Sequence, residues 1–228
     1  SNDLEDVINR FNTPNIPLKL VPIISNVGLG KALSIGLLVC KHDLVARMDS
    51  DDISKPNRFF KQVNFFKQNL NIDVISSWAD EFIGDKSNII SVRKTPEKHI
   101  DCIKRLKITS PFNHPAVMFK KSAVIRSGNY REFYLKEDTY LWMRMFNSNC
   151  KFANIQESLL YFRMSKNMFY RRSGLKYIKS EIKIFNFSLM IGLINYLEYI
   201  FFLLPIIFIR LLPVNFLSFI YTKIIRKC

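Results

Sequence analysis

The chain has 228 residues, enough for one ordinary domain with a C-terminal extension, and 48% of them are hydrophobic, which excludes extensive disorder. Its 34 Lys and Arg residues against 19 Asp and Glu residues give a formal net charge of +15. This excess favours an anionic partner, such as nucleic acid, an acidic membrane or a phosphorylated substrate, although a basic solvated surface would also account for it. The 4 cysteines are scattered and only 3 histidines are present, which argues against a zinc site.

Apolar periodicity predicts strands and helices that alternate along the chain. The expected strands are Val21–Ile24, Leu44–Met48, Ile72–Trp78, Ala116–Phe119 and Leu159–Phe162, and the expected helices are Leu29–Cys40, Pro56–Gln68, Pro96–Leu106 and Glu137–Phe146. Residues 25–28 read as a turn that leads into the first of these helices. Alternation of this kind predicts an α/β fold with a layered sheet.

An acidic cluster follows the second predicted strand. Asp49, Asp51 and Asp52 come directly after it, and ligands of open α/β sheets bind at the carboxyl ends of strands. Carboxylates there can hold a hard divalent cation, which in turn can neutralise a diphosphate. Three alternatives remain open: an exposed turn, a cap made by Asp52 or Ser54 on the helix that Pro56 opens, and a phosphatase with an Asp nucleophile.

Several motifs in a fixed order carry a family resemblance. They are NVGLGKAL at 26–33, ARMDSDDI at 46–53, Arg58-Phe59 with Gln62, HPAVMF at 114–119, and E-D-x-x-L-W at 137–142. In this order and spacing, residues 20–165 resemble family 2 glycosyltransferases of bacterial surface polysaccharide loci. The resemblance implies the GT-A fold, a mixed sheet with flanking helices, and a nucleotide-diphosphate sugar as donor.

The resemblance also implies roles for individual residues. Asp49 and Asp51 would hold the donor ribose and a divalent metal, Mn²⁺ or Mg²⁺, with Asp52 as a supporting acid. Asp138 is similar to the general base that deprotonates the acceptor hydroxyl. Further residues are expected at the donor (Asn26, Gly28, Lys31, Arg47 and Arg163) or near the acceptor (His114, Glu137 and Trp142).

The chemistry of direct displacement suits these residue types. A carboxylate base at Asp138 on one face and a stabilised diphosphate on the other need no covalent intermediate, so the resemblance implies inversion at the anomeric carbon. Simpler interpretations stay open for three residues. Asp138 can serve the helix dipole, His114 can be structural before Pro115, and Trp142 can belong to the core or to a pocket wall.

The chain departs from the family pattern at two places. The family opens with a strand and a base-binding loop ahead of the segment equivalent to residues 1–20, so a catalytic domain at 1–170 that lacks its first strand is expected. An inactive fragment or a membrane-surface interaction module is the alternative. The family often has Arg-x-His where this chain has Arg163-Met164-Ser165, so no histidine ligand is assigned.

Residues 171–228 are expected to form hydrophobic helices. The 23-residue run Phe187–Ile209 is long enough to span a bilayer, but Asn195 and Glu198 lie inside it. Basic residues at 223, 226 and 227 favour an in-plane anchor on anionic lipid. The resemblance implies the cytoplasmic face of the bacterial inner membrane as the location. A true span and a helical cap packed on the domain are the alternatives. Such an anchor fits a lipid-linked saccharide acceptor. Nucleic acid is not an expected partner, because RRM, zinc-finger and helix-turn-helix signatures are absent, and a basic nucleic-acid-binding protein stays a third possibility.

Overall fold

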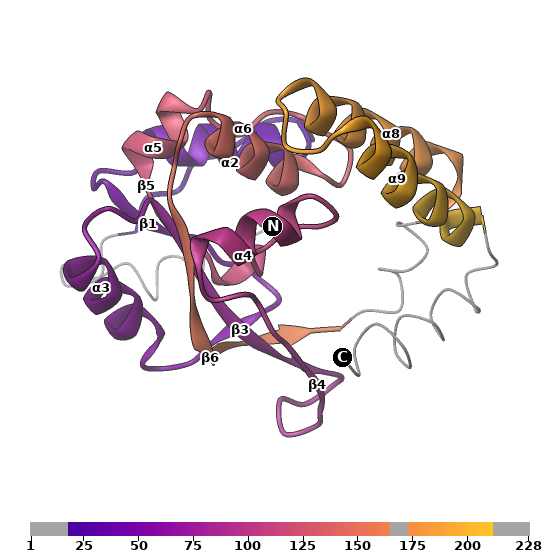
Figure 1. The fold of residues 1–228 in the computed structure, drawn as a ribbon. Helices are drawn as coiled ribbons and strands as arrows, with labels where there is room; N and C mark the ends of the chain where they lie inside the picture. Colours follow the sequence, from indigo (N-terminus) through magenta and orange to yellow (C-terminus); the bar gives the residue numbers. More distant parts are fainter. Residues whose placement is uncertain (1–17, 165–172, 212–228) are drawn as a thin grey trace.

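A mixed six-stranded sheet lies at the centre of the protein (Figure 1). The structure is a computed structural model that describes residues 18–164 and 173–211. The strands are β1 (Leu44–Ala46), β2 (Ile53–Ser54), β3 (Val74–Phe82), β4 (Ile89–Arg93), β5 (Met118–Lys120) and β6 (Phe152–Arg163). The helices are α2 (Leu29–Val39), α3 (Arg58–Gln68), α4 (His99–Leu106), α5 (Lys121–Arg126), α6 (Glu137–Asn147), α8 (Gly174–Met190) and α9 (Tyr196–Leu211), with a 3-10 turn, η1, at His114–Ala116.

The strand order is β1-β5-β3-β6-β2, and β4 pairs with β3 off this path. β3 and β6 run parallel, whereas β5 is antiparallel to both β1 and β3. β1 therefore points the same way as β3 and β6, and the segment that follows it emerges at the carboxyl edge of these strands. This is the edge at which open α/β sheets bind their ligands.

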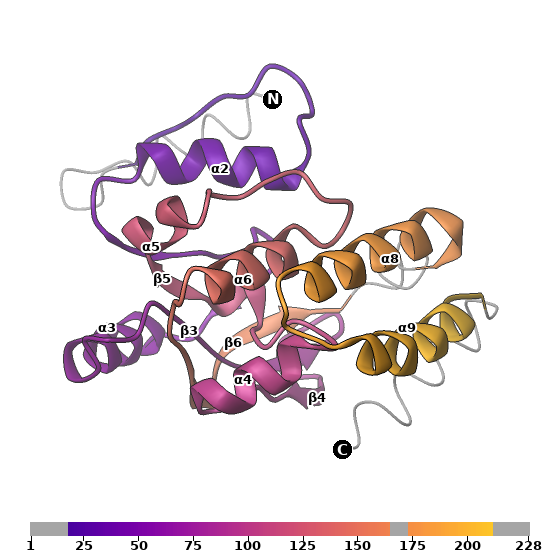
Figure 2. The ribbon, with the colours of Figure 1, turned by 45° about the horizontal axis from the view of Figure 1, so that its top comes forward.

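Helices cover both faces of the sheet. Successive residues of a strand point to opposite faces, so each face has its own core. Val74 and Phe152 face a large core that includes residues of α2, α4, α5, α6, α8 and α9. Their neighbours Ile75 and Ala153 face a smaller core beneath α3, which contributes Phe66. Figure 2 shows α2, α5 and α6 on one side of the strands and α3 apart from them. The alternation predicted from sequence is thus a layered α/β structure.

One predicted strand is wrong. Residues 21–24 have no strand conformation, and Ile23 and Ile24 are 37% and 105% exposed. The apolar run was expected to be a buried strand, but a strand needs a partner for its backbone groups, and none of the described strands pairs with it.

Other elements differ in extent from the prediction. β6 begins at Phe152 rather than Leu159, because its polar residues find buried partners: the Asn154 amide nitrogen donates to the Pro96 carbonyl at 2.6 Å. β4 and α5 were not predicted, since β4 is a largely exposed edge strand and α5 has only 6 residues. The strand expected at Ala116–Phe119 splits into η1 and β5.

The hydrophobic run Phe187–Ile209 is divided between two helices. α8 ends at Met190, and Gly192 with φ 69° begins the turn to α9. Asn195 and Glu198 form a reciprocal capping box: the Asn195 side chain accepts the Glu198 N–H at 2.9 Å, and the Glu198 carboxylate accepts the Asn195 N–H at 3.0 Å. Among the described residues, no helix has both the length and the apolarity that a bilayer crossing requires. The expected basic anchor at 223–227 lies outside the described residues.

The two C-terminal helices lie against each other and on the domain (Figures 1 and 2). Phe185 of α8 and Leu203 of α9 are buried in the same core as Leu141 and Trp142 of α6. The helices predicted for the C-terminal segment therefore share the core of the α/β domain over their described part.

Candidate active site

The acidic loop follows β1 at the carboxyl edge of the sheet. Carboxylate oxygens of Asp49, Asp51 and Asp52 all lie within 4.8 Å of one another. The Arg47 guanidinium binds Asp49 in a bidentate pair, with 2.8 Å between Nη1 and Oδ2. Bidentate pairing fixes the orientation of the Asp49 carboxylate as well as neutralising it.

Asp52 is the buried member of this cluster. Its Oδ1 accepts the Arg163 N–H at 2.9 Å, and its Oδ2 is buried without a hydrogen-bond partner among the described residues. Burial, with the neighbouring Asp49 and Asp51 charges, raises the pKa of Asp52 to about 6. Three hard oxygen donors with an unsatisfied buried oxygen among them fit a divalent cation such as Mn²⁺ or Mg²⁺, which would offset this repulsion.

Arg163 ties the acidic loop to the end of β6. Its Nε donates to the Asp51 carbonyl at 3.0 Å, and its Nη1 donates to the Gly84 carbonyl at 2.8 Å. The guanidinium also lies 4.6 Å from the centre of the Phe82 ring. The family resemblance placed Arg163 at the donor; the structure brings this residue to the acidic cluster, but with these two donors directed at backbone carbonyls.

A buried pair on α3 supports the loop from below. Arg58 is fully buried, and its Nη2 donates to the Arg47 carbonyl at 2.7 Å and to the Val117 carbonyl at 3.3 Å. Its Nε donates to Gln62 Oε1 at 3.1 Å, and the Gln62 amide donates to the Ala116 carbonyl at 2.7 Å. Arg58 and Gln62 thus join the end of β1 to the η1–β5 segment. Both residues belong to the motifs that carry the family resemblance, but the sequence predicted no role for either.

His114 and Tyr130 form a second polar group beside the loop. The His114 Nε2 and the Tyr130 hydroxyl are 3.0 Å apart. Burial and the nearby Arg47 charge lower the pKa of His114 to about 3, with Asp138 acting in the opposite direction. His114 is therefore a neutral imidazole at physiological pH. No sequence signal singled out Tyr130.

The first turn of α6 lies near the same group. Burial raises the pKa of Tyr130, and the negative charges of Asp138, Glu137 and Asp49 add to the effect while Arg47 opposes it. Glu137 is buried, and Asp138 is partly exposed at the N-terminal end of the helix. The Arg47 N–H donates to the Val117 carbonyl at 3.0 Å, and the His114 ring lies 6.0 Å from the ring of Trp142 on α6, so residues 114–117 contact both the start of the acidic loop and α6.

The remaining predicted residues lie at the helix that precedes the site and in the core. The Asn26 side chain accepts the Gly28 N–H at 3.0 Å, and Gly28 has φ 78°, so both shape the turn into α2. Lys31 is exposed in the first turn of this helix. Trp142 is fully buried, and its ring lies edge-on to Phe112 at 5.0 Å between centroids, so it belongs to the core.

Comparison with known proteins identifies the family. The profile of glycosyl transferase family 2 matches residues 1–128. A β-1,3-galactosyltransferase of Escherichia coli, which uses UDP-Gal and α-D-GlcNAc-diphosphoundecaprenol, is 39% identical over 227 residues that cover 100% of this chain and 82% of its own. The chain belongs to glycosyl transferase family 2. This glycosyltransferase is also 34% identical to the amylovoran biosynthesis glycosyltransferase AmsE of Erwinia amylovora, over 98% of this chain and 83% of that protein.

Solved structures agree on the fold of this family 2 glycosyltransferase. The TarS structure from S. aureus with UDP-GlcNAc superimposes with a TM-score of 0.62 at 13% identity, over 91% of this chain. A mannosyltransferase of Pyrobaculum calidifontis with GDP-Man and Mn²⁺ gives 0.58 at 13% identity, over 83% of this chain. The chain spans 60% and 52% of these two larger chains. The expected GT-A architecture is thereby confirmed, as an α/β mixed sheet with flanking helices.

Proposed function

We propose that this glycosyltransferase moves a sugar, with inversion, from a nucleotide-diphosphate donor to a lipid-linked saccharide during bacterial surface polysaccharide synthesis. The observation that carries the proposal is the cluster of three carboxylates at the carboxyl edge of the sheet, beside residues 114–117, which contact the helix that Asp138 opens through Trp142. Donor-side and acceptor-side carboxylates at one centre are what single displacement requires, since the base and the leaving group act on the same anomeric carbon.

The donor side is the acidic loop. Asp49 and Asp51 would hold Mn²⁺ or Mg²⁺, which when bound supplies positive charge to the departing diphosphate. Arg47, already oriented by Asp49, adds a second positive charge at this position. We assign Asn26, Gly28 and Lys31 to the donor as well, through the N-terminal turn of α2. Arg163 contributes by holding the loop.

The acceptor side is the start of α6. Asp138 takes the proton from the acceptor hydroxyl, and a positioned carboxylate of this kind contributes roughly 10²–10⁴-fold in rate. His114 remains neutral and can accept or donate a hydrogen bond without adding charge. Glu137 and Asp52 support the helix and the loop from buried positions, and Trp142 forms part of the wall behind them.

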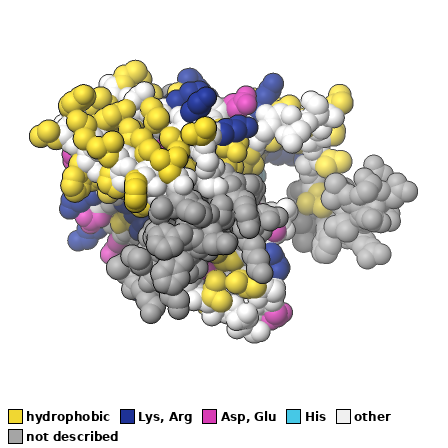
Figure 3. All heavy atoms as spheres, turned by 90° about the vertical axis from the view of Figure 1, so that its right-hand side faces the viewer, with side chains coloured by type: hydrophobic (Ala, Val, Ile, Leu, Met, Phe, Trp, Pro, Cys, Tyr) yellow, Lys and Arg dark blue, Asp and Glu magenta, His cyan; other side chains and the backbone are white. Residues whose placement is uncertain are grey.

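A face of α9 supports the lipid-linked acceptor and a membrane surface as its location. Leu197, Phe201, Leu204, Phe208 and Leu211 follow helical spacing and are 78%, 73%, 61%, 67% and 61% exposed. Figure 3 shows hydrophobic side chains gathered on this side of the molecule, with Lys and Arg side chains at their upper edge. An apolar helix face bordered by basic residues suits the surface of an anionic bilayer, so we place the enzyme on the cytoplasmic face of the inner membrane.

Transfer assays with matched Asp variants test the catalytic assignment. UDP-Gal, UDP-GlcNAc and GDP-Man are each supplied with Mn²⁺ or Mg²⁺ and a lipid-diphosphate GlcNAc acceptor. Asp138→Asn is expected to lower transfer by about 10²–10⁴-fold while donor binding measured by calorimetry is retained. Asp51→Asn is expected to lose Mn²⁺-dependent donor binding, and Asp101→Asn, an exposed acid of α4, serves as the control.

Four results would count against this proposal. Full activity of Asp138→Asn refutes the base, and unchanged Mn²⁺ binding by Asp51→Asn refutes the metal site. A product with retained anomeric configuration by NMR refutes inversion. Loss of nucleotide-sugar binding by the wild-type chain would favour the inactive interaction module instead.

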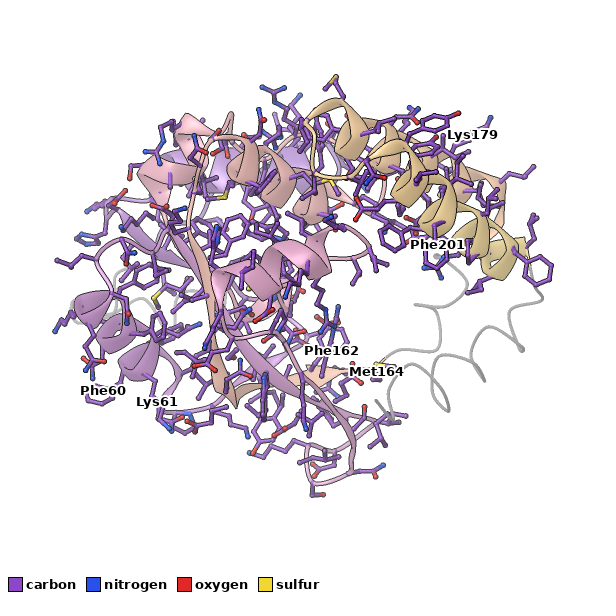
Figure 4. All side chains as sticks on the ribbon, in the orientation of Figure 1. Phe60, Lys61, Phe162, Met164, Lys179 and Phe201 are labelled. Carbon is purple, nitrogen blue, oxygen red and sulfur yellow. The ribbon has the colours of Figure 1, made fainter. Side chains whose placement is uncertain are left out.

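Vesicle sedimentation tests the membrane face. Phe201→Ser is expected to reduce binding to vesicles of phosphatidylcholine and phosphatidylglycerol. Phe60→Ser is the control, because Phe60 is 70% exposed on α3, on the opposite side of the molecule in Figure 4. Equal binding by both variants and the wild type would refute this assignment.

A further inference from the structure

α8 contacts the segment that leads directly into α6. The Ser180 hydroxyl donates to the Tyr134 carbonyl at 2.6 Å, and the Glu181 carboxylate pairs with Lys136 at 3.0 Å. Lys176, one turn earlier on α8, lies 4.2 Å from the centre of the Tyr134 ring. Three residues of α8 therefore contact residues 134 and 136, on either side of Leu135.

Leu135 has a backbone conformation that needs such support. Its φ of 54° lies in the left-handed region, which is unfavourable for a residue with a branched side chain. Strained residues of this kind persist where the surrounding structure holds them in place. The left-handed step turns the chain immediately before Glu137 and Asp138, so the direction in which α6 starts depends on it.

Glu181 is the centre of a buried charge cluster. Its side chain is 3% exposed, and two cations surround it, Lys136 at 3.0 Å and Arg210 of α9 at 3.6 Å. Both cations also lie over the Tyr177 ring, at 5.4 Å and 4.8 Å from its centre. Burial on its own disfavours the charged form of Lys136, but Tyr177 and Glu181 outweigh it and raise the pKa of Lys136. Removing the carboxylate would leave two partly buried cations, with side chains 11% and 21% exposed, facing each other.

We propose that Glu181 is a positioning residue for the transfer reaction: through Lys136 it fixes the start of α6, and with it the place of Asp138. This inference rests on the proposed function, in which Asp138 is the base. The acidic loop follows β1 and is held by Arg58 and Arg163, so it does not depend on the contacts of α8 with residues 134 and 136. Loss of Glu181 therefore acts on the chemical step and spares donor binding.

The first test is amide hydrogen exchange by mass spectrometry on the full chain, and it needs no substrate. In Glu181→Gln, peptides covering 131–140 are expected to exchange faster, whereas those covering 47–54 exchange at the wild-type rate. Glu198→Gln is the matched control, because Glu198 also ties the C-terminal helices to the domain, through Lys107 at 2.6 Å, but at the end of α4. Unchanged exchange at 131–140 in Glu181→Gln overturns the proposal.

The second test is the split between kcat and KM, with whichever nucleotide sugar the wild type uses. Glu181→Gln is expected to lower kcat at least tenfold with the donor KM unchanged, and Glu198→Gln is expected to stay within twofold of the wild type. In an Asp138→Asn background, Glu181→Gln is expected to have no further effect, because both changes act through one carboxylate. An additive further loss, or a raised donor KM with unchanged kcat, overturns the proposal.

A milder variant covers the case in which Glu181→Gln does not fold. Ser180→Ala removes only the hydrogen bond to the Tyr134 carbonyl and is expected to lower kcat by a smaller factor, again with the donor KM unchanged. An unchanged kcat counts against a positioning role for these α8 contacts. The two proposals fail separately. A fully active Asp138→Asn variant refutes the base, whereas an inactive Asp138→Asn beside a wild-type-like Glu181→Gln refutes only the positioning role.

Discussion

Replacement of Arg58 by methionine removes the support beneath the acidic loop while keeping a side chain of similar length. In the structure, the Arg58 guanidinium donates to three acceptors, and the substitution removes all three bonds. The acceptors are the carbonyls of Arg47 and Val117 and the Gln62 side-chain oxygen. The Gln62 side chain can turn, and the Val117 carbonyl keeps the Arg47 N–H at 3.0 Å. One buried carbonyl, that of Arg47, is therefore left unpaired, which costs about 1–3 kcal/mol.

An opposing contribution reduces this cost. The pKa of Arg58 is lowered to about 10 by burial and by Arg47, so the guanidinium is charged at neutral pH and its desolvation is unfavourable in the wild type. Methionine recovers part of that penalty, which leaves a net loss of roughly 1–2 kcal/mol in the free energy of unfolding. For a chain of this size, such a loss lowers Tm by roughly 2–8 °C.

Urea and thermal unfolding of Arg58→Met and Lys61→Met measure the effect. Lys61 lies on the same helix and pairs with Glu157, and their side chains are 36% and 45% exposed, respectively. Such surface ion pairs contribute at most about 1 kcal/mol to the free energy of unfolding. Arg58→Met is also expected to weaken Mn²⁺-dependent donor binding, because the Arg47 carbonyl loses its anchor. Equal unfolding free energies for the two variants would refute the reasoning.

Three further predictions concern packing, pH and reactivity. A Cβ on Gly30 would meet the Arg131 carbonyl oxygen at 2.5 Å, whereas a Cβ on Gly36 would meet nothing within 4 Å. Thermal unfolding should therefore show Gly30→Ala destabilised by about 1–3 kcal/mol and Gly36→Ala stabilised by up to about 1 kcal/mol. The pKa of His114 is lowered to about 3 from 6.5, so the unfolded chain takes up this proton first. The free energy of unfolding should therefore fall as the pH is lowered from 6.5 to 3, by up to about 1.4 kcal/mol per pH unit. Urea unfolding at pH 7 and at pH 5 should show a smaller fall for His114→Gln than for the wild type. Equal falls would contradict the argument. Burial raises the pKa of the Cys102 thiol to about 12, so native protein treated with iodoacetamide at pH 8 should leave this cysteine unlabelled by mass spectrometry until urea is added.

Sequence alone determined the parts of the protein that depend on local pattern. The helices α2, α3 and α6 follow from apolar residues at helical spacing, and their observed bounds agree with the prediction within two residues at each end. The acidic cluster follows from a short apolar strand with three carboxylates behind it. The family follows from motifs in a fixed order, which needs no knowledge of contacts.

Only the tertiary structure decided what those motifs touch. From the sequence, Arg58 was only one residue of a motif at the start of a predicted helix. In the structure it is buried, and it donates to the Arg47 and Val117 carbonyls, which come from different segments. Asn195 and Glu198 looked like a cost inside a bilayer, but they cap a helix for each other. Such roles depend on partners up to 59 residues away or on where a helix begins, and hydrophobic periodicity carries neither kind of information.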